Sequence, residues 1–338
     1  VDTDGDGILD AIDEDDDADG YSDVMEVEEG TDPLNIESRP GSIIPQITSS
    51  LVPQTGMKTS YAPNEDGDLR SGLPRNYLRD DATGIVTDSV NGLKWHDTPE
   101  TQDLSLSWRD ASYHCLDSEL GGITDWRLPN KYELMHLSDF NEVGKTSGRA
   151  MLDDVFVYGS TSEYWSYDYR SNDVFTVNFS VPKYQLRNTD NDALKVRCGS
   201  GVEVDGPHAG PISTSDDAPF AVVDKYNHLM WQDTEEIKTN ELTWEEALSY
   251  CENLSVEGLG EWRLPNSHEI HTVADELYLE YNSAFRNLPS EYEAEWWLST
   301  GDDLYPGESM VLMASLGSYN HYSKFQSQPK YVRCVFRW

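Results

Sequence analysis

The stretch Trp126-Arg127-Leu128-Pro129-Asn130 occurs a second time, letter for letter, as Trp262-Arg263-Leu264-Pro265-Asn266. The offset of 136 residues between the two also superimposes many other residues of uncommon types. They are Trp95 on Trp231, Asp97 on Asp233, Trp108 on Trp244, Ala111 on Ala247, Cys115 on Cys251, Glu133 on Glu269, and Val196-Arg197-Cys198 on Val332-Arg333-Cys334. Matches at one fixed offset, over copies too long for a solenoid unit, indicate a tandem duplication of a whole domain.

The repeated pentapeptide ends one segment and starts a helix in each copy. Asn130 with Glu133, and Asn266 with Glu269, have the spacing of a helix cap and its reciprocal partner. The pentapeptide has the residues of a structural motif. These are a Trp that can pack in the core, an Arg that can pair with an internal carboxylate or carbonyls, and a Pro before the cap. We therefore predict that the pentapeptide belongs to the core rather than to an active site. The same prediction applies to Trp95, Trp108 and their partners in the second copy.

Helix and strand patterns alternate within each copy. Cap residues at Ser107 and Thr243 precede apolar residues at helical spacing, which predicts a further helix per copy. The last third of each copy is rich in aromatic and β-branched residues, which predicts short antiparallel strands. We expect Val196-Arg197-Cys198 and Val332-Arg333-Cys334 to be the closing strands. The predicted fold class is α+β, with two tandem modules that each contain two helices and short antiparallel strands.

Each copy contains two cysteines, and both pairs are 83 residues apart. Identical placement in both copies predicts disulfides between Cys115 and Cys198 and between Cys251 and Cys334. Metal binding by two isolated thiols is the weaker alternative, because no His or Cys cluster in the sequence has metal-ligand spacing. Disulfides place a protein in an oxidising compartment, so we expect an extracellular or cell-surface location.

The formal net charge is −39, and it is spread along the chain. Residues 1 to 38 hold 16 acidic and no basic side chains, so the remainder has 47 acidic against 24 basic residues, a balance of −23. Such a field repels nucleic acid, anionic lipid and sulfated glycans, and it favours divalent cations. Acidity for solubility in a salty medium is an alternative explanation. No apolar run is long enough to span a membrane.

Residues 1–36 contain two acidic loops separated only by Glu14. Both loops have the pattern of a calcium loop. Such a loop has oxygen ligands at positions one, three, five, nine and twelve, a Gly at position six and a backbone carbonyl ligand at position seven. The predicted calcium ligands are Asp2, Asp4, Asp6, Ile8, Asp10 and Asp13 in the first loop, and Asp15, Asp17, Asp19, Tyr21, Asp23 and Glu26 in the second. The stretch resembles the tandem calcium repeats of thrombospondin type three. That resemblance implies a calcium-stiffened spacer, and we expect further repeats before Val1.

We expect five parts along the chain, in which composition marks the linkers and the family resemblance given below implies the bounds of the two modules. They are the calcium repeats at 1–36, a linker at 37–53 with several Pro, Ser and Thr residues, the first module at 54–200, a second linker at 201–214, and the second module at 215–338.

The order of motifs in both modules resembles the C-terminal domain of the bacterial collagen-like adhesin Lcl. The motifs are Gly92-Leu93-Lys94-Trp95, Leu229-Met230-Trp231-Gln232-Asp233, the Trp108 and Trp244 helices with their Cys, both pentapeptides, Tyr164-Trp165-Ser166 and the Arg-Cys endings. The resemblance implies a variant of the C-type lectin-like fold, similar in shape to formylglycine-generating enzymes, in secreted or surface-anchored proteins of which some bind glycans. The Glu-Pro-Asn and Gln-Pro-Asp triplets of a lectin calcium site do not occur in the sequence. That calcium site is therefore not expected.

No motif in the sequence favours an enzyme. His268 and His271 have a metal-like spacing on the predicted helix, but Tyr132 and Met135 stand at these positions in the first copy, so we interpret them as surface residues. The leading hypothesis is a calcium-binding adhesin or ligand-binding module, with a neutral glycan or a surface protein as partner. The alternative is a structural subunit of a calcium-dependent filament or matrix, in which the partner is another copy of the chain. The sequence does not identify the ligand-binding residues.

Overall fold

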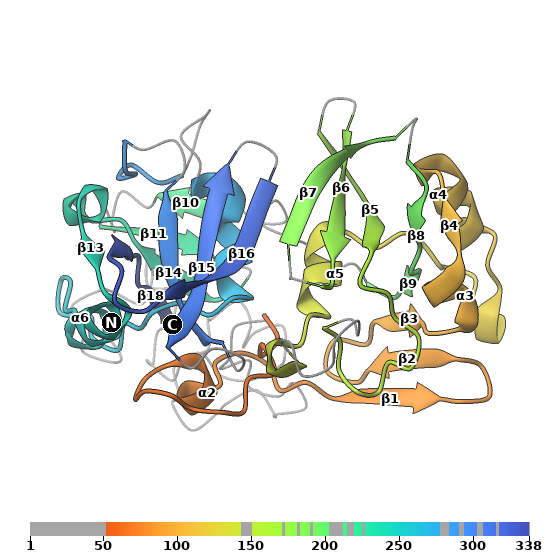
Figure 1. Ribbon diagram of the computed structural model, residues 1–338, viewed down its shortest axis with the longest axis horizontal. Helices are drawn as coiled ribbons and strands as arrows, with labels where there is room; N and C mark the ends of the chain where they lie inside the picture. Colours follow the sequence, from red (N-terminus) through yellow and green to blue (C-terminus); the bar gives the residue numbers. More distant parts are fainter. Residues whose placement is uncertain are drawn as a thin grey trace, which may run out of the picture. The chain divides into compact units, whose positions relative to one another are not determined.

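The computed structural model describes most of the chain after residue 51 (Figure 1). The described residues are 52–142, 151–170, 173–180, 183–189, 192–202, 212–214, 220–224, 227–277, 284–290, 294–302, 307–315 and 318–337. All twelve predicted calcium ligands, between Asp2 and Glu26, lie outside the described residues. Among the described helices, none is both long and apolar enough to cross a membrane.

The first copy combines three helices with two sheets. Its helices are α3 (Pro99–Asp103), α4 (Trp108–Leu116) and α5 (Lys131–His136), with 3-10 turns η1 (Leu120–Gly122) and η2 (Phe140–Glu142). Its strands are β1 (Tyr77–Asp80), β2 (Ile85–Asp88), β3 (Lys94–His96), β4 (Ser105–Leu106), β5 (Glu163–Arg170), β6 (Asp173–Asn178), β7 (Lys183–Asn188), β8 (Leu194–Lys195) and β9 (Gly199–Ser200). The helix α2 (Asp66–Leu69) precedes them.

The second copy repeats this arrangement. Its helices are η3 (Glu235–Lys238), α6 (Trp244–Asn253) and η4 (Glu269–Leu277). Its strands are β10 (Ile212–Thr214), β11 (Ala221–Asp224), β12 (Leu229–Gln232), β13 (Glu241–Leu242), β14 (Glu295–Gly301), β15 (Glu308–Ser315), β16 (Ser318–Phe325), β17 (Lys330–Tyr331) and β18 (Val335–Arg337). The mixture of helices and sheets agrees with the predicted α+β class.

Both copies use the same strand order. Four-stranded antiparallel sheets run β1-β2-β3-β9 and β10-β11-β12-β18. The remaining strands follow the orders β4-β8-β5-β6-β7 and β13-β17-β14-β15-β16, and Figure 1 shows β5, β6 and β7 side by side. Each order contains one parallel pair that the antiparallel prediction missed, β5 with β8 and β14 with β17. The duplication in the sequence is therefore a duplication of topology.

The two copies are joined into one structure. The edge strands β7 and β16 pair with each other and form a ten-stranded sheet. One hydrophobic cluster contains Trp95 and Leu134 of the first copy together with Trp231 and Ile270 of the second. The outermost strands of the joint sheet, β4 and β13, are only two residues long, so this sheet offers little edge for pairing with another chain.

The predicted caps start the helices of both copies, with one difference. Ser107 accepts a hydrogen bond from the amide of Asp110 at the start of α4, and Thr243 forms a capping box with Glu246 at α6. Asn130 and Glu133 form the capping box of α5. After Asn266, however, the predicted α-helix is the 3-10 helix η4. Residues 266–274 are buried throughout, so tertiary packing rather than the cap determines the winding of this segment.

The predicted closing strands are wrong. Val196-Arg197-Cys198 lies between β8 and β9, and the second triplet lies between β17 and β18. At each triplet the chain leaves the ten-stranded sheet and enters a four-stranded sheet. Each triplet also places a buried Arg next to an internal carboxylate. A change of sheet at this point interrupts the hydrogen-bonded ladder.

Residues 52–75 pack against the second copy. The hydroxyl of Thr300 donates to the Asp66 carboxylate at 2.7 Å, and the Asn266 side chain donates to the Ser71 carbonyl at 3.1 Å. The ring of Tyr61 lies so close to Gly301 that a Cβ there would come within 2.9 Å of it. These contacts connect the start of the first predicted module to the second one.

Asp66 makes the stability of these contacts dependent on pH. Burial raises the pKa of Asp66 from 3.8 to about 7, with Thr55 and Thr300 donating to its carboxylate. The folded state therefore binds this proton more tightly than the unfolded state, and stability falls as the pH rises from about 4 to about 7. The shift corresponds to roughly 4 kcal/mol.

We expect the Asp66→Asn variant to lose this part of the pH dependence. Urea unfolding of the wild type and the variant at pH 5 and pH 8 measures it, and the free energy of unfolding should decline less for the variant. Asp68→Asn, at an exposed position of α2, is the matched control and should follow the wild type. An unchanged decline in Asp66→Asn would contradict the assignment.

Candidate functional site

The repeated pentapeptide is a structural element in both copies. Arg127 pairs with both carboxylate oxygens of Glu133 at 2.7 Å, and Glu133 also accepts the Asn130 amide at 2.9 Å. Arg263 and Glu269 repeat this bidentate pair at 2.7 and 2.5 Å. Trp126 and Trp262 are 1% and 2% exposed. In the first copy the Glu133 carboxylate thus binds both the Arg127 guanidinium and the backbone amide at the helix N-cap. This confirms the prediction that the pentapeptide has a structural role in the core.

The tryptophans are core residues rather than exposed platforms. Eight are fully buried, namely Trp95, Trp126, Trp165, Trp231, Trp244, Trp262, Trp296 and Trp297. Trp108 is partly buried and donates its indole N–H to the Ser166 carbonyl at 2.9 Å, as Trp244 does to the Leu298 carbonyl at 2.8 Å. Exposed aromatic surface in the described residues is therefore contributed by other side chains, mainly tyrosines.

Two of these tyrosines lie on β5 of the first copy. Tyr167 is 37% exposed and Tyr169 is 74% exposed, and both follow Trp165 on the strand. In the second copy Trp297 matches Trp165, so Ser299 and Gly301 occupy the corresponding positions. Ser299 is buried, and Gly301 lies under Tyr61. The segment after the Trp is thus exposed and aromatic in the first copy and covered in the second.

A buried ionic network lies under the four-stranded sheet of each copy. In the first copy Arg197 donates to the carbonyls of His96 and Tyr158 and lies 3.4 Å from the Asp97 carboxylate. The amides of Val157 and Tyr158 also donate to Asp97 at 2.8 and 3.0 Å. In the second copy Arg333 and Asp233 repeat the arrangement with Arg286 and Asn287. Burial lowers the pKa of Arg333 to about 10, so it stays charged at neutral pH.

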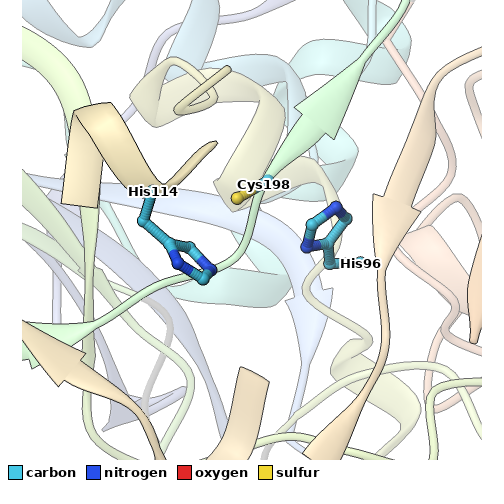
Figure 2. Close-up of side chains that lie close together, drawn as sticks. All are labelled: His96, His114 and Cys198. Carbon is cyan, nitrogen blue, oxygen red and sulfur yellow. The ribbon is translucent and has the colours of Figure 1, made fainter. Parts of the chain in front are cut away.

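A cleft of about 420 Å³ opens beside this network in the first copy. It is lined by His96, Thr98, Glu100, His114, Asp117, Ser118 and Leu120. His96 comes from β3, Glu100 from α3 and His114 from α4, so three separate elements bring their side chains together. Figure 2 shows the two imidazoles on either side of the Cys198 sulfur. One ring nitrogen of each histidine and this sulfur lie within 4.8 Å of one another.

The three side chains differ in how firmly they are held. His96 is 7% exposed, its ring lies edge-on to Trp126 at 4.2 Å between centroids, and its Nε2 is 3.3 Å from the Ser118 hydroxyl. Burial, and then the charges of His114 and Arg197, lower the pKa of His96 to about 4. His96 is therefore neutral at pH 7 and keeps a ring nitrogen lone pair. The side chains of His114 and Glu100 are 31% and 70% exposed.

Cys198 does not supply a thiolate to this cleft. The structure contains both predicted disulfides, Cys115 with Cys198 and Cys251 with Cys334, each with Cα atoms 5.5 Å apart. The donors of the cleft are therefore the two imidazoles and nearby oxygens. Sequence reasoning missed this group because His96, Glu100 and His114 show no compact spacing. The alignment of the two copies could have indicated this group, because the offset of 136 residues places His96 and His114 opposite Gln232 and Tyr250.

The interpretation of His268 and His271 as surface residues is wrong. Both are 0% exposed. His268 Nδ1 lies 3.0 Å from the Pro53 carbonyl, and its ring lies 5.4 Å from that of His136 in the first copy. His268 therefore contributes to packing between the copies. Periodicity alone showed the helix but not what would cover its polar face.

Comparison with known proteins identifies the repeated unit. The profile of the Lcl C-terminal domain matches residues 84–199 and again residues 220–336. No curated protein matches the sequence. The two matched segments contain both pentapeptides, both disulfides and both buried Arg–Asp networks, and together they span more than half of the chain. The chain belongs to the Lcl C-terminal domain family and contains that domain twice.

Proposed function

We propose that the chain is part of an extracellular, calcium-binding bacterial surface protein whose Lcl C-terminal domains bind a ligand. The observation that carries the proposal is the combination of two disulfide-closed copies of this domain with an acidic stretch of calcium-loop spacing in one chain. In this proposal residues 1–36 form a calcium-stiffened spacer, and each domain has a C-type lectin-like fold. The role is adhesion rather than catalysis.

The ligand we propose is a neutral glycan or a surface protein. The chain outside residues 1–38 still has a charge balance of −23, which opposes sulfated glycans. The exposed Tyr167 and Tyr169 on β5 give the first copy an aromatic face, and aromatic rings are common contact residues at binding surfaces. Since the matching face of the second copy is covered near Gly301, we assign binding to the first copy.

A binding and mass measurement with and without Ca²⁺ tests this proposal. We expect the full chain to remain a monomer in millimolar Ca²⁺, to take up Ca²⁺ through Asp4 and Asp17, and to be retained by a neutral glycan or a surface protein on an array. Tyr169→Ala should weaken retention about fivefold, because a stacked aromatic ring contributes on the order of 1 kcal/mol. Tyr113→Ala, which removes another exposed tyrosine, is the control.

Other results would count against adhesion. A polymer that forms only with Ca²⁺ and is lost in Asp4→Asn/Asp17→Asn would favour the alternative, a structural subunit of a fibre or matrix. Absence of Ca²⁺ uptake by the wild type would contradict the calcium-stiffened spacer.

A further inference from the structure

The cleft of the first copy is lined by two imidazoles and a carboxylate, from His96, His114 and Glu100. The Nε2 atom of His114 lies 3.9 Å from the Glu100 carboxylate, which is too far for a hydrogen bond. A ring nitrogen of His96 lies within 4.8 Å of one of His114. Two imidazoles and one carboxylate, facing a common space from three elements, are the ligand types that divalent transition metals prefer.

In the second copy the corresponding three side chains are joined by hydrogen bonds. Gln232, Glu236 and Tyr250 stand where the first copy has His96, Glu100 and His114. The Tyr250 hydroxyl donates to Glu236 at 2.7 Å, and the Gln232 side chain donates to both residues at 3.2 and 2.8 Å. The carboxylate is thus common to both copies. Its two neighbours are neutral hydrogen-bonding groups in one copy and imidazoles in the other.

From this comparison we propose that the cleft of the first copy binds one divalent transition-metal ion, Zn²⁺ or Cu²⁺, through His96, His114 and Glu100. His96 is the fixed ligand, because it is buried and packed on Trp126. His114 and Glu100 are more exposed and complete the site by moving toward it. The remaining coordination positions face the cleft and are open to water or to a ligand's donor atom.

The two imidazoles need only a small movement to share one ion, whereas the Glu100 side chain has to turn toward them. Metal–nitrogen bonds of about 2.0 to 2.1 Å in a tetrahedral site place ligand atoms roughly 3.3 Å apart. The two imidazoles have ring nitrogens at most 4.8 Å apart. The Glu100 carboxylate lies 3.9 Å from His114 Nε2 but outside the group that contains both imidazoles, and its side chain, 70% exposed, is free of the core and able to turn toward the ion. Nitrogen ligands also separate this site from the acidic N-terminal loops, since Ca²⁺ prefers an all-oxygen set.

Zinc titration of the full chain in excess Ca²⁺ tests the proposal. Ca²⁺ occupies oxygen-only sites, so isothermal titration calorimetry should then show one Zn²⁺ bound per chain. The His96→Gln/His114→Tyr variant carries the residues of the second copy and should retain the fold, which thermal unfolding without Zn²⁺ checks. We expect it to bind Zn²⁺ about 100-fold more weakly or worse, because losing even a hydrogen-bond partner of a metal-bound histidine costs 10- to 100-fold.

Two further measurements sharpen the result. Electron paramagnetic resonance with Cu²⁺ should show coupling to two imidazole nitrogens in the wild type and lose it in the double variant. The reciprocal Gln232→His/Tyr250→His variant should bind a second Zn²⁺. The proposal is overturned if the double variant binds Zn²⁺ as the wild type does, or if the wild type binds none in excess Ca²⁺. These outcomes are independent of glycan or protein binding.

Discussion

Replacement of Asp97 by Ala is expected to lower the free energy of unfolding by about 3 to 5 kcal/mol, which is the usual cost of removing one partner of a buried charge pair. Arg197 is 0% exposed and would lose the carboxylate that balances its charge. The amides of Val157 and Tyr158 would lose their acceptor at the same time. The Arg197 guanidinium and the two amides are shielded from water, so water cannot replace the lost carboxylate, and the folded state alone is destabilised.

Asp81→Ala provides a matched control. Asp81 pairs with Arg79 at 2.7 Å, and its side chain is 89% exposed. Asp97 pairs with the same Arg but is buried. An exposed pair contributes about 1 kcal/mol or less. Equilibrium urea unfolding followed by tryptophan fluorescence compares the two variants. If the losses were equal, burial would not be the reason for the effect.

Removal of one disulfide is the second large change. In the Cys115→Ala/Cys198→Ala variant, the unfolded chain regains the freedom of a loop of 83 residues. The chain-entropy model gives a loss of about 4 to 5 kcal/mol for such a loop. Both cysteines are buried in the core beside Trp126, so the substitution also removes packed sulfur atoms.

The other disulfide is an internal comparison. Cys251 and Cys334 enclose a loop of the same separation, with the same Cα distance of 5.5 Å. Cys251→Ala/Cys334→Ala should therefore lower stability by a similar amount in non-reducing urea titrations. A loss below about 2 kcal/mol in both variants would exclude chain entropy as the main contribution. A loss in only one would indicate that the two loops differ in residual structure when unfolded.

Local patterns predicted a large part of the fold. The pentapeptide with Asn130 and Glu133 predicted a cap, a buried Trp and a paired Arg, because all the partners lie within a few residues of one another. The aromatic segment after Tyr164 predicted β5 and β6 for a similar reason, since strand patterning is visible in short windows. Equal cysteine spacing in two copies predicted the disulfides without any geometry.

Long-range packing was not accessible in the same way. The pairing of β7 with β16 and the packing of residues 52–75 against Thr300 could not be predicted from sequence periodicity. A contact between distant segments does not change the local residue pattern of either segment. For this reason His268 and His271 were misassigned to the surface. The cleft of His96 and His114 went unpredicted because its members are brought together by β3, α3 and α4.

The sequence by itself determined that the chain contains one domain twice, that each copy is α+β, and which cysteines pair, because repetition and short-range spacing are properties of the chain alone. The tertiary structure decided how the two copies join and which side chains meet in the cleft. Strands β7 and β16 pair and join the two copies in one sheet. Two imidazoles meet in only one of them. The pairing of the copies and the meeting of side chains in the cleft depend on the whole fold, since both are produced by segments that are far apart in the sequence.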